Sequence, residues 1–432
     1  MAVDVIVGLQ RGDEGKGRFV DIAAKDYDII ARFNGGNNAG HTVVLANGDV
    51  LKLHLVPSGI AHVGVVNIIG NGTLINLEKL VEEIASIEAK GISVTSENLK
   101  ISSSAHLIIP SHIYDDEIRE AGDGRQGSTK SGIAQVSAAK ALRIGVRAEM
   151  LKNDPEGLKS AIYDALMIQQ PLREAASLPA INERKVADDY VESTKHLAEF
   201  VTDTVVYIND ALRAAKPTRV LAEGAQAFLL DIDHGMYPFT TSTSTTSGGV
   251  AAGLGVAPSF IGKVTGVAKA VQSHVGGGPY VTEVTDEAEL AKLHGDMTTV
   301  DAEYGTTTGR KRRLGYLDLP QIRRANLING TNEVILSKVD WVPRYGDNIK
   351  ICIAYEKDGQ RIEIAPDSAI SIEKSTPIYE VLPSWSEDIQ GVRSFSDLPQ
   401  AAKDYVEFIE KQLGVKVSIL GVGPDPDQII IR

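Results

Sequence analysis

Two glycine-rich stretches near the N-terminus contain the residue types that phosphate chemistry requires. The first, Gly-Asp-Glu-Gly-Lys-Gly at residues 12–17, follows an apolar run at 3–7, and the second, Asn-Asn-Ala-Gly-His-Thr at 37–42, follows a run at 28–32. A glycine turn between a strand and a helix presents backbone N–H groups to phosphate, and a nearby lysine neutralises its charge. The first stretch therefore predicts a nucleotide-phosphate loop.

The presence of Asp13 in this loop needs a chemical explanation. A carboxylate beside bound phosphates is repelled unless it binds Mg²⁺ or takes a proton. Asp13 therefore predicts a metal ligand or a general base, and His41 on the neighbouring turn is a candidate partner in the same chemistry. Gly17 stands where a P-loop kinase carries the Mg²⁺-binding Ser or Thr after its lysine, which disfavours a kinase.

A third motif, Ser337-Lys-Val-Asp340, ends an apolar run at 333–336 and resembles the [NT]-K-x-D motif of GTP-binding proteins. An aspartate at a strand end can accept both N1–H and N2–H of guanine, whereas adenine offers an acceptor at N1. Lys338 would lay its stem along the base. Together with the phosphate loop, the motif favours GTP over ATP, although a strand-end turn with a solvated aspartate is the alternative.

Four consecutive cations, Arg-Lys-Arg-Arg at 310–313, follow three threonines and Gly309. Arginine binds carboxylate and phosphate through two parallel hydrogen bonds, so this loop predicts an anion clamp. A solvated basic face or a protein-binding patch is the alternative.

With these motifs the sequence resembles adenylosuccinate synthetase, whose family carries G-D-E-G-K-G and G-G-x-N-A-G-H-T at this spacing. Further family blocks follow in family order at 223–235, in the Ser/Thr run ending at Gly248-Gly249, at 306–313 and at 423–425. The resemblance covers nearly the whole chain.

The resemblance implies that the protein joins IMP and L-aspartate, hydrolysing GTP to GDP and phosphate, and gives adenylosuccinate on the path to AMP. Asp13 would remove the purine N1 proton, and His41 would donate to a phosphoryl oxygen. Lys16 would neutralise the phosphates, and Gln226 would touch the purine. Mg²⁺ would be held by Asp13 and the carbonyl of Gly40.

The resemblance also assigns the substrate contacts. It places on IMP the residues Asp13, Glu14, Gly15, Lys16, Asn38, Ala39, Gly40, His41, Thr129, Arg143, Gln226, Thr241 and Arg310. It places on aspartate Thr306, Thr307, Thr308, Gly309, Arg310, Lys311 and Arg312. It places on GTP Gly12, Gly15, Lys16, Gly17, Gly40, His41, Thr42, Arg312, Lys338, Val339, Asp340, Gly421, Val422 and Gly423. Arg143 matches an arginine that the family donates across a dimer interface, so a homodimer is expected.

Composition narrows the class of protein. A formal net charge of −13 argues against a nucleic-acid or anionic-membrane surface. No N-terminal signal peptide and no apolar run of about 20 residues is visible. The single cysteine, Cys352, lies between two isoleucines and predicts a buried structural thiol in a reducing cytoplasm. No Cys/His cluster has zinc-ligand spacing, so any metal should be oxygen-bound Mg²⁺.

The predicted fold is a single α/β domain over 1–432. Short apolar runs at 3–7, 28–32, 65–70, 219–222 and 333–336 alternate with helical stretches at 78–90 and 194–215, which predicts a large, mainly parallel twisted sheet with flanking helices. The GTP-binding core resembles a P-loop fold with insertions. Residues 350–365 read as a hairpin around Lys-Asp-Gly, so a small antiparallel appendage is expected.

Some positions depart from the family pattern. Residues 127–135 read Gly-Ser-Thr-Lys-Ser-Gly-Ile-Ala-Gln where the family usually has G-T-T-G-R-G-I-G-P, so Ser131 replaces an arginine. Arg11 replaces a tryptophan, and Gly421-Val-Gly423 lacks the family's common hydroxyls. A paralogue that acts on dIMP, dGMP or another 6-oxopurine nucleotide is one alternative, although the phage branch with a deoxyguanylate acceptor loses the loop aspartate, and Asp13 is retained. A non-catalytic GTP-binding protein is the other.

Overall fold

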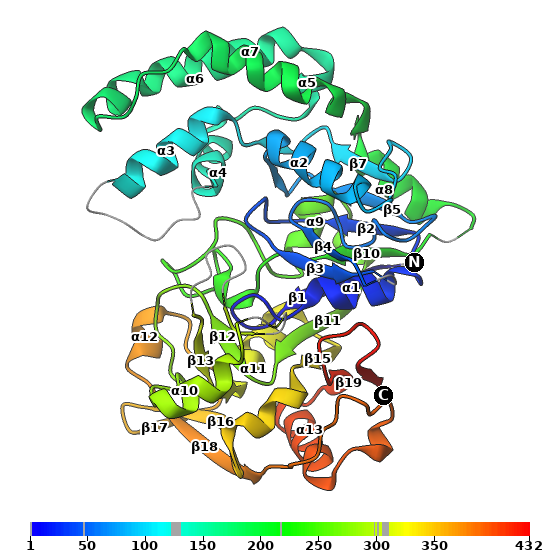
Figure 1. Cartoon of the computed structure of the whole chain (residues 1–432), viewed down its shortest axis with the longest axis vertical. Coiled ribbons are helices and arrows are strands. Elements are labelled where there is room, and N and C mark those ends of the chain that lie inside the picture. The colour runs from blue at the N-terminus through cyan, green and yellow to red at the C-terminus, as the bar shows by residue number, and fades with distance from the viewer. Residues whose placement is uncertain are drawn as a thin grey trace.

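The computed structural model describes residues 2–45, 48–121, 131–216, 218–297, 299, 302–304 and 311–432. Across these residues one large sheet has the strand order β20-β19-β15-β11-β1-β10-β2-β5-β7-β9 (Figure 1). Its strands are β1 (Val3–Gly8), β2 (Ile29–Arg32), β5 (Val66–Ile69), β7 (Leu99–Ser102), β9 (Val201–Thr202), β10 (Val220–Glu223), β11 (Ile261–Lys269), β15 (Glu333–Ser337), β19 (Lys416–Gly421) and β20 (Ile429–Ile431).

The pairing confirms the predicted parallel sheet. Every neighbouring pair in the described part of this sheet is parallel except β19 with β20. Strands covered on both faces read as continuous apolar runs, and the valines of β1 are fully buried. The five predicted strands agree with β1, β2, β5, β10 and β15 to within one or two residues at each end.

The helices that flank the sheet lie toward both ends of the molecule. In Figure 1, α5, α6 and α7 lie at one end beyond α2, and α13 lies with the C-terminus at the other. The helices are α1 (Lys16–Ala24), α2 (Leu77–Glu88), α3 (Pro110–Ala121), α4 (Ile133–Leu142), α5 (Glu149–Asn153), α6 (Pro155–Ala175), α7 (Glu183–Thr194), α8 (Thr204–Arg213), α9 (Gly249–Leu254), α10 (Glu287–His294), α11 (Leu319–Asn329), α12 (Ala369–Glu373) and α13 (Gln400–Leu413).

The prediction of one helix over 194–215 was wrong. The 3₁₀ helix η1 (Lys195–Phe200) follows α7, β9 then pairs with the end of β7, and α8 begins only at Thr204. The Asp203 side chain caps α8 by accepting a hydrogen bond of 3.0 Å from the Val206 amide. Strand pairing at the sheet edge therefore overrides the local helical pattern. The predicted helix at 78–90 agrees with α2.

Smaller sheets surround the main one. The predicted hairpin is present as β16 (Asn348–Lys357) and β17 (Gln360–Ile362), and Asp358 and Gly359 have the positive φ angles that its tight turn requires. The strand β18 (Thr376–Pro383) pairs with β16 on its other side, and Cys352 is buried as predicted. The remaining strands are β3 (His41–Val44), β4 (Val50–Leu53), β6 (Leu74–Ile75), β8 (His106–Leu107), β12 (Gln272–His274), β13 (Arg313–Gly315) and β14 (Leu317–Asp318).

Two large apolar clusters hold these layers together. One joins β1, β10, β11, β15 and β19 to α11 and α13, and the other joins β5 and β7 to α2, α6 and α7. Among the described helices, none combines the length and the apolar character needed to cross a bilayer.

A buried carboxyl links the appendage to the core and generates a pH prediction. Asp318 is fully buried, caps α11, and accepts hydrogen bonds of 2.8 and 2.6 Å from the Tyr355 hydroxyl. Burial raises the pKa of Asp318 to about 6. Because this lies above the pKa of an unfolded aspartate, near 3.9, the folded state holds the proton more tightly and loses stability as the pH rises through about 6.

We therefore expect acidification from pH 7.5 to 5.5 to raise the unfolding free energy of the wild type by roughly 1 kcal/mol relative to Asp318→Asn. Urea unfolding of both proteins at both pH values measures this difference. An identical pH dependence in the two proteins would contradict it.

Candidate functional site

The phosphate loop leaves the carboxyl end of β1, between the ends of β10 and β11. Gly12, Asp13 and Gly15 all have positive φ, so the loop turns sharply before α1 begins at Lys16. No side chain caps the first turn of α1. Amide groups at a helix N-terminus that lack a capping side chain attract anions, so the loop has the geometry of a phosphate site.

Glu14 holds the loop together from inside. Its carboxylate accepts a hydrogen bond of 2.8 Å from the Gly12 amide and one of 2.7 Å from the Lys16 ammonium, and both Glu14 and Lys16 are buried. A side chain at residue 17 would collide with its neighbour, since an added Cβ would lie 2.6 Å from the His41 Cβ. This contact explains why glycine replaces the P-loop Ser or Thr.

His41 lies at the start of β3 and faces a buried carboxylate. Its Nδ1 contacts Glu223 Oε1, and Glu223 also accepts hydrogen bonds of 2.7 and 2.8 Å from the hydroxyl and amide of Ser58. Burial lowers the pKa of the His41 imidazole, and the neighbouring Glu223 carboxylate opposes this shift. Burial would raise the pKa of Glu223, but His41, Arg32 and Ser58 lower it to about 2. Glu223 therefore orients the ring and leaves Nε2 for another partner.

The glycine-rich turn at 34–40 is joined to the end of β10. The Asn34 side chain exchanges hydrogen bonds of 3.0 and 2.8 Å with the backbone of Ala225, and the Gln226 amide donates to Asn38 Oδ1 at 3.1 Å. Gln226 has a positive φ. The structure thus brings together two predicted purine-site residues that are far apart in sequence. The backbone amide of Thr241 donates to Leu230, and its hydroxyl is buried.

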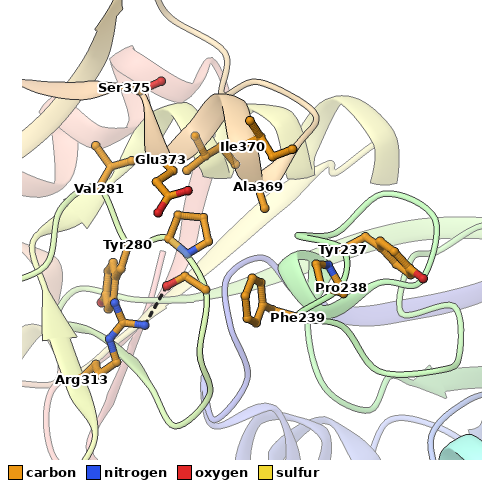
Figure 2. Close-up of a pocket in the computed structure, with 13 residues that line it drawn as sticks. Tyr237, Pro238, Phe239, Tyr280, Val281, Arg313, Ala369, Ile370, Glu373 and Ser375 are labelled. Carbon is orange, nitrogen blue, oxygen red and sulfur yellow. Dashed lines mark hydrogen bonds between the residues drawn. The ribbon is translucent and has the colours of Figure 1, made fainter. Parts of the chain in front are cut away.

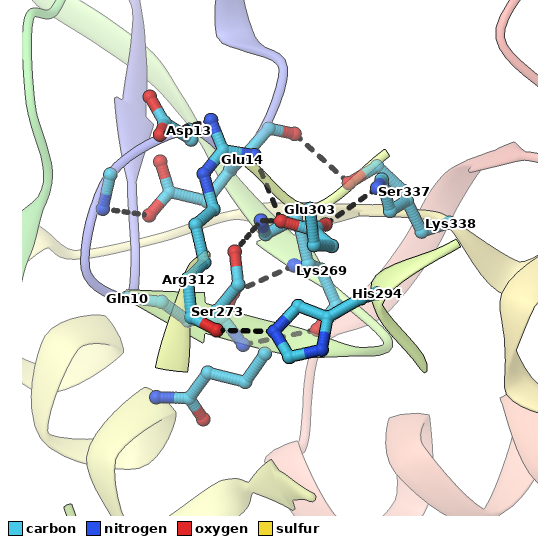
Figure 3. A network of polar contacts seen from close by, with 12 residues as sticks. Gln10, Asp13, Glu14, Lys269, Ser273, His294, Glu303, Arg312, Ser337 and Lys338 are labelled. Atoms are coloured by element: carbon cyan, nitrogen blue, oxygen red, sulfur yellow. Dashed lines mark hydrogen bonds and ion pairs between the residues drawn. The ribbon is translucent and has the colours of Figure 1, made fainter. Parts of the chain in front are cut away.

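A chain of ion pairs connects the phosphate loop to the end of β15 (Figure 3). Asp13 Oδ2 lies 2.7 Å from Arg312 Nη2, and Arg312 Nη1 lies 2.8 Å from Glu303 Oε2. Glu303 also contacts the ammonium groups of Lys269 at 3.3 Å and Lys338 at 2.5 Å. The loop base and the guanine motif, predicted separately, therefore share one electrostatic network.

Three segments of the chain meet at the predicted guanine site. Ser337 donates a hydrogen bond of 2.9 Å to the Glu14 carbonyl, and Lys338, with positive φ, starts the 3₁₀ helix η4 (Val339–Tyr345). Val339 is buried, and Asp340 accepts from Gln390 at 3.2 Å. From α1, Arg18 donates to the carbonyls of Gly423 at 2.6 Å and Gln428 at 3.1 Å.

Arg143 is not brought to this cluster. It is the exposed C-cap of α4, which lies beside α3 and apart from α1 (Figure 1). Thr42 in β3, Gly40 and Lys311 are exposed. Outside the described residues lie Thr129, Thr306, Thr307, Thr308, Gly309 and Arg310.

Sequence reasoning missed several residues of the site. Glu223, Glu303, Lys269 and Ser58 carry the buried polar contacts, yet none had been given a role. Glu223 and Lys269 each end an apolar strand, and a charged residue at that position was the signal available.

A cavity of about 720 Å³ lies elsewhere (Figure 2). Tyr237, Phe239, Tyr280, Arg313 and Ile370 are among its lining residues, and Arg313 is the last of the four predicted cations. Arg313 pairs with Glu283 at 2.5 Å, and the lining includes neither the phosphate loop nor His41, so the ends of the parallel strands are the better candidate.

The comparisons with known proteins concern the whole chain. The family model of adenylosuccinate synthetase matches residues 5–430. An adenylosuccinate synthetase of Streptococcus gordonii is 43% identical over 430 residues, covering 98% of this chain and 96% of that protein, and one of Streptococcus sanguinis is 42% identical over 429 residues, with the same coverage.

Solved structures show the same fold. A fully ligated adenylosuccinate synthetase from Plasmodium falciparum superposes with a TM-score of 0.90 at 34% identity, covering 100% of both chains. A succinoaminodeoxyadenylate synthetase of cyanophage S-2L, bound to dGMP and dATP, has a TM-score of 0.61 at 19% identity and covers 100% of this chain and 95% of that one. The second likeness shows the fold alone.

The contacts of Arg18 generate a prediction about the C-terminal loop. Replacing Arg18 with Met keeps the side-chain stem but removes its hydrogen bonds to the carbonyls of residues 423–428. We expect at least about tenfold faster amide hydrogen exchange in that loop, since each lost bond contributes about 1 kcal/mol.

Arg393→Met is the matched control. It removes an exposed ion pair of 3.0 Å to Asp427 of the same loop, which should change exchange little. Equal effects of the two substitutions would contradict a specific role for Arg18.

Proposed function

Because this chain belongs to the adenylosuccinate synthetase family, we propose that it joins IMP and L-aspartate with hydrolysis of GTP. The enzyme is a carbon–nitrogen ligase of AMP biosynthesis, and its products are adenylosuccinate, GDP and phosphate. The observation that supports this best is that the loop carrying Asp13 packs at Gly17 against His41, whose ring is held by the buried Glu223 at the end of β10. A loop that only binds phosphate needs neither group.

The first step must activate the purine. The 6-oxo group of hypoxanthine leaves poorly, so its oxygen is phosphorylated before the amine attacks, and this requires loss of the N1 proton. Asp13 is 43% exposed and projects from the loop, which makes it the accessible carboxylate to take that proton. Gln226 and Asn38 would contact the purine from the adjoining turn.

His41 would stabilise the phosphoryl group in transfer. Because the Glu223 carboxylate accepts from Nδ1, the ring donates from Nε2 to a phosphoryl oxygen when it is protonated on both nitrogens, and the charge of Glu223 favours that form. A preorganised donor of this kind costs no reorientation during the reaction. The Lys16 ammonium, held by Glu14, and the first amides of α1 would neutralise the remaining phosphate charge.

The donor groups present fit Mg²⁺. This ion is usually bound by one or two carboxylates together with substrate phosphates, and Asp13 with the Gly40 carbonyl offers such a set. The space around Gly40 is open, with nothing within 4 Å of an added Cβ. Among the described residues no cluster of three His, Cys, Asp or Glu side chains exists, so an all-protein metal cage is not the expected arrangement. Bound there, Mg²⁺ would neutralise phosphate charge.

The aspartate substrate would meet the cations at 310–312 and the threonines before them. Arg312 is already directed at carboxylates, since it pairs with Asp13 and Glu303. After phosphorylation of O6, the aspartate amine attacks C6 and phosphate leaves. Lys338 and Asp340 would bind the guanine of GTP, with Gly421, Val422 and Gly423 close by.

We also propose a cytoplasmic homodimer in which Arg143 reaches the partner's IMP, the whole chain acting as one domain. Arg143 is exposed between Leu142 and Ile144, whose side chains are 66% and 73% exposed. An arginine flanked by exposed aliphatic side chains is typical of an interface.

Mass spectrometry of products tests the function. The protein is incubated with GTP, Mg²⁺ and L-aspartate together with IMP, dIMP, GMP or dGMP in separate reactions. We expect an aspartate-dependent adduct of IMP far above the others. Preference for another nucleotide would mark a paralogue, and no adduct with any of them would exclude a synthetase.

The role of Asp13 predicts the behaviour of Asp13→Asn. The variant should lose turnover by at least about 10³-fold while still binding GTP, because the amide cannot take the proton. Stopped assays and calorimetry measure the two quantities. Asp21→Asn, a change on α1 that breaks an ion pair with His62, is the control and should turn over normally. Substantial activity in Asp13→Asn would remove Asp13 from the base role.

The role of His41 predicts a different pattern. His41→Asn should lower kcat by about 10²- to 10³-fold with a modest change in KM, as expected for a donor used in the transition state. Steady-state kinetics measures both, and His62→Asn is the matched control. A near-normal kcat would reduce His41 to a scaffolding residue.

A further inference from the structure

Glu303 is fully buried and contacts three cations that come from different parts of the chain (Figure 3). Lys269 ends β11, Lys338 follows β15, and Arg312 precedes β13. The carboxylate lies 3.3 Å from the Lys269 ammonium, 2.5 Å from that of Lys338 and 2.8 Å from the Arg312 guanidinium. One side chain therefore fixes the position of three others.

The electrostatics favour a permanently ionised Glu303. Burial would raise the pKa of its carboxyl, but Lys269, Lys338 and Arg312 hold that pKa well below the usual range. Burial lowers the pKa of Lys269 to about 8. Removing the carboxylate would leave buried cations without their counter-charge, and an unpaired buried charge is strongly unfavourable.

Two of these cations belong to different ends of the proposed site. Lys338 starts η4, two residues before Asp340, and its ammonium also lies 3.9 Å from the centre of the Trp341 ring. Arg312 reaches past Glu303 to Asp13 at 2.7 Å. Among its described members, three cations face the carboxylates of Glu303 and Asp13, an excess of one positive charge that suits an anionic substrate.

We propose that Glu303 is a positioning residue that couples the guanine end of the site, through Lys338, to the aspartate end, through Arg312. The coupling rests on the proposed function, because that function places GTP and the aspartate substrate at these two ends. Since both cations share one carboxylate, a ligand that displaces either of them changes the charge that the other faces.

A purely structural carboxylate would behave differently. It would lower stability when replaced, but it would leave the two substrate affinities independent of each other. The test must therefore measure KM for each substrate together with kcat and stability.

The experiment compares Glu303→Gln, Lys338→Met and their double variant, with Glu410→Gln as the control. Glu410 makes an ion pair of similar length, 2.7 Å, with Arg432, remote from the site. For each protein, KM for GTP and for aspartate, kcat, the Kd of GDP by calorimetry and the thermal unfolding midpoint are measured.

We expect Glu303→Gln to raise both KM values about tenfold, with a smaller change in kcat. Lys338→Met should raise KM for aspartate at least threefold, although it lies at the guanine end. In the double variant, Lys338→Met should have little further effect on aspartate, because the link is already broken. Glu410→Gln should leave both KM values unchanged.

Additive effects in the double variant, or a change confined to the unfolding midpoint, would overturn the coupling. If Glu303→Gln does not fold, Lys338→Met alone decides, since an unchanged KM for aspartate contradicts the proposal. A wild type that binds GDP but forms no adduct would refute the proposed ligation. The change in GDP affinity caused by Glu303→Gln would still test the role of Glu303. A wild type that neither binds GDP nor forms the adduct would refute both the proposed function and this inference.

Discussion

The parallel hydrogen-bonding register around β1 is the constraint on which the site depends. Ile6 pairs with Glu223, Gly8 with Val267, and Lys269 with Ser337, so the carboxyl ends of four strands meet at one edge of the sheet. Residues hundreds of positions apart are thereby placed side by side without any loop having to be long. In open α/β sheets this edge is where ligands bind, and the phosphate loop emerges there between β10 and β11.

Buried charged side chains then fix the orientation of the groups that the strand register brings together. Glu223 and Glu303 are both fully buried, and each holds a functional group in a fixed orientation, His41 in one case and Arg312 in the other. Buried carboxylates are tolerated only when hydrogen bonds or cations compensate for lost hydration, so their partners are restricted in position. His41 and Arg312 are thus each held in place by a buried carboxylate.

The sequence predicted correctly the features that depend on residues close together in the chain. Glycine spacing located the loop at 12–17, apolar runs located the central strands, and the Asp-Gly pair located the β16–β17 hairpin. It failed where a contact joins residues that are far apart in the sequence. A helical pattern over 194–215 cannot show that Val201 pairs with Ile101 of another strand. No motif indicates the ion pair between Glu303 and Lys269. The roles of Glu223 and Ser58 likewise arise from contacts across 165 positions of sequence. Local sequence patterns also do not explain why Arg11 and Ser131 differ from the residues usual in the family.

The most direct test of this chemistry follows the oxygen atom at C6 of the purine. IMP labelled with oxygen-18 at that position is converted with GTP, aspartate and Mg²⁺, and the released phosphate is analysed by mass spectrometry. Because the purine oxygen attacks the γ-phosphoryl group and leaves with it, we expect the label in phosphate, in proportion to the adenylosuccinate formed. Unlabelled phosphate accompanying the same product would contradict a 6-phosphoryl intermediate, and with it the roles assigned to Asp13 and His41.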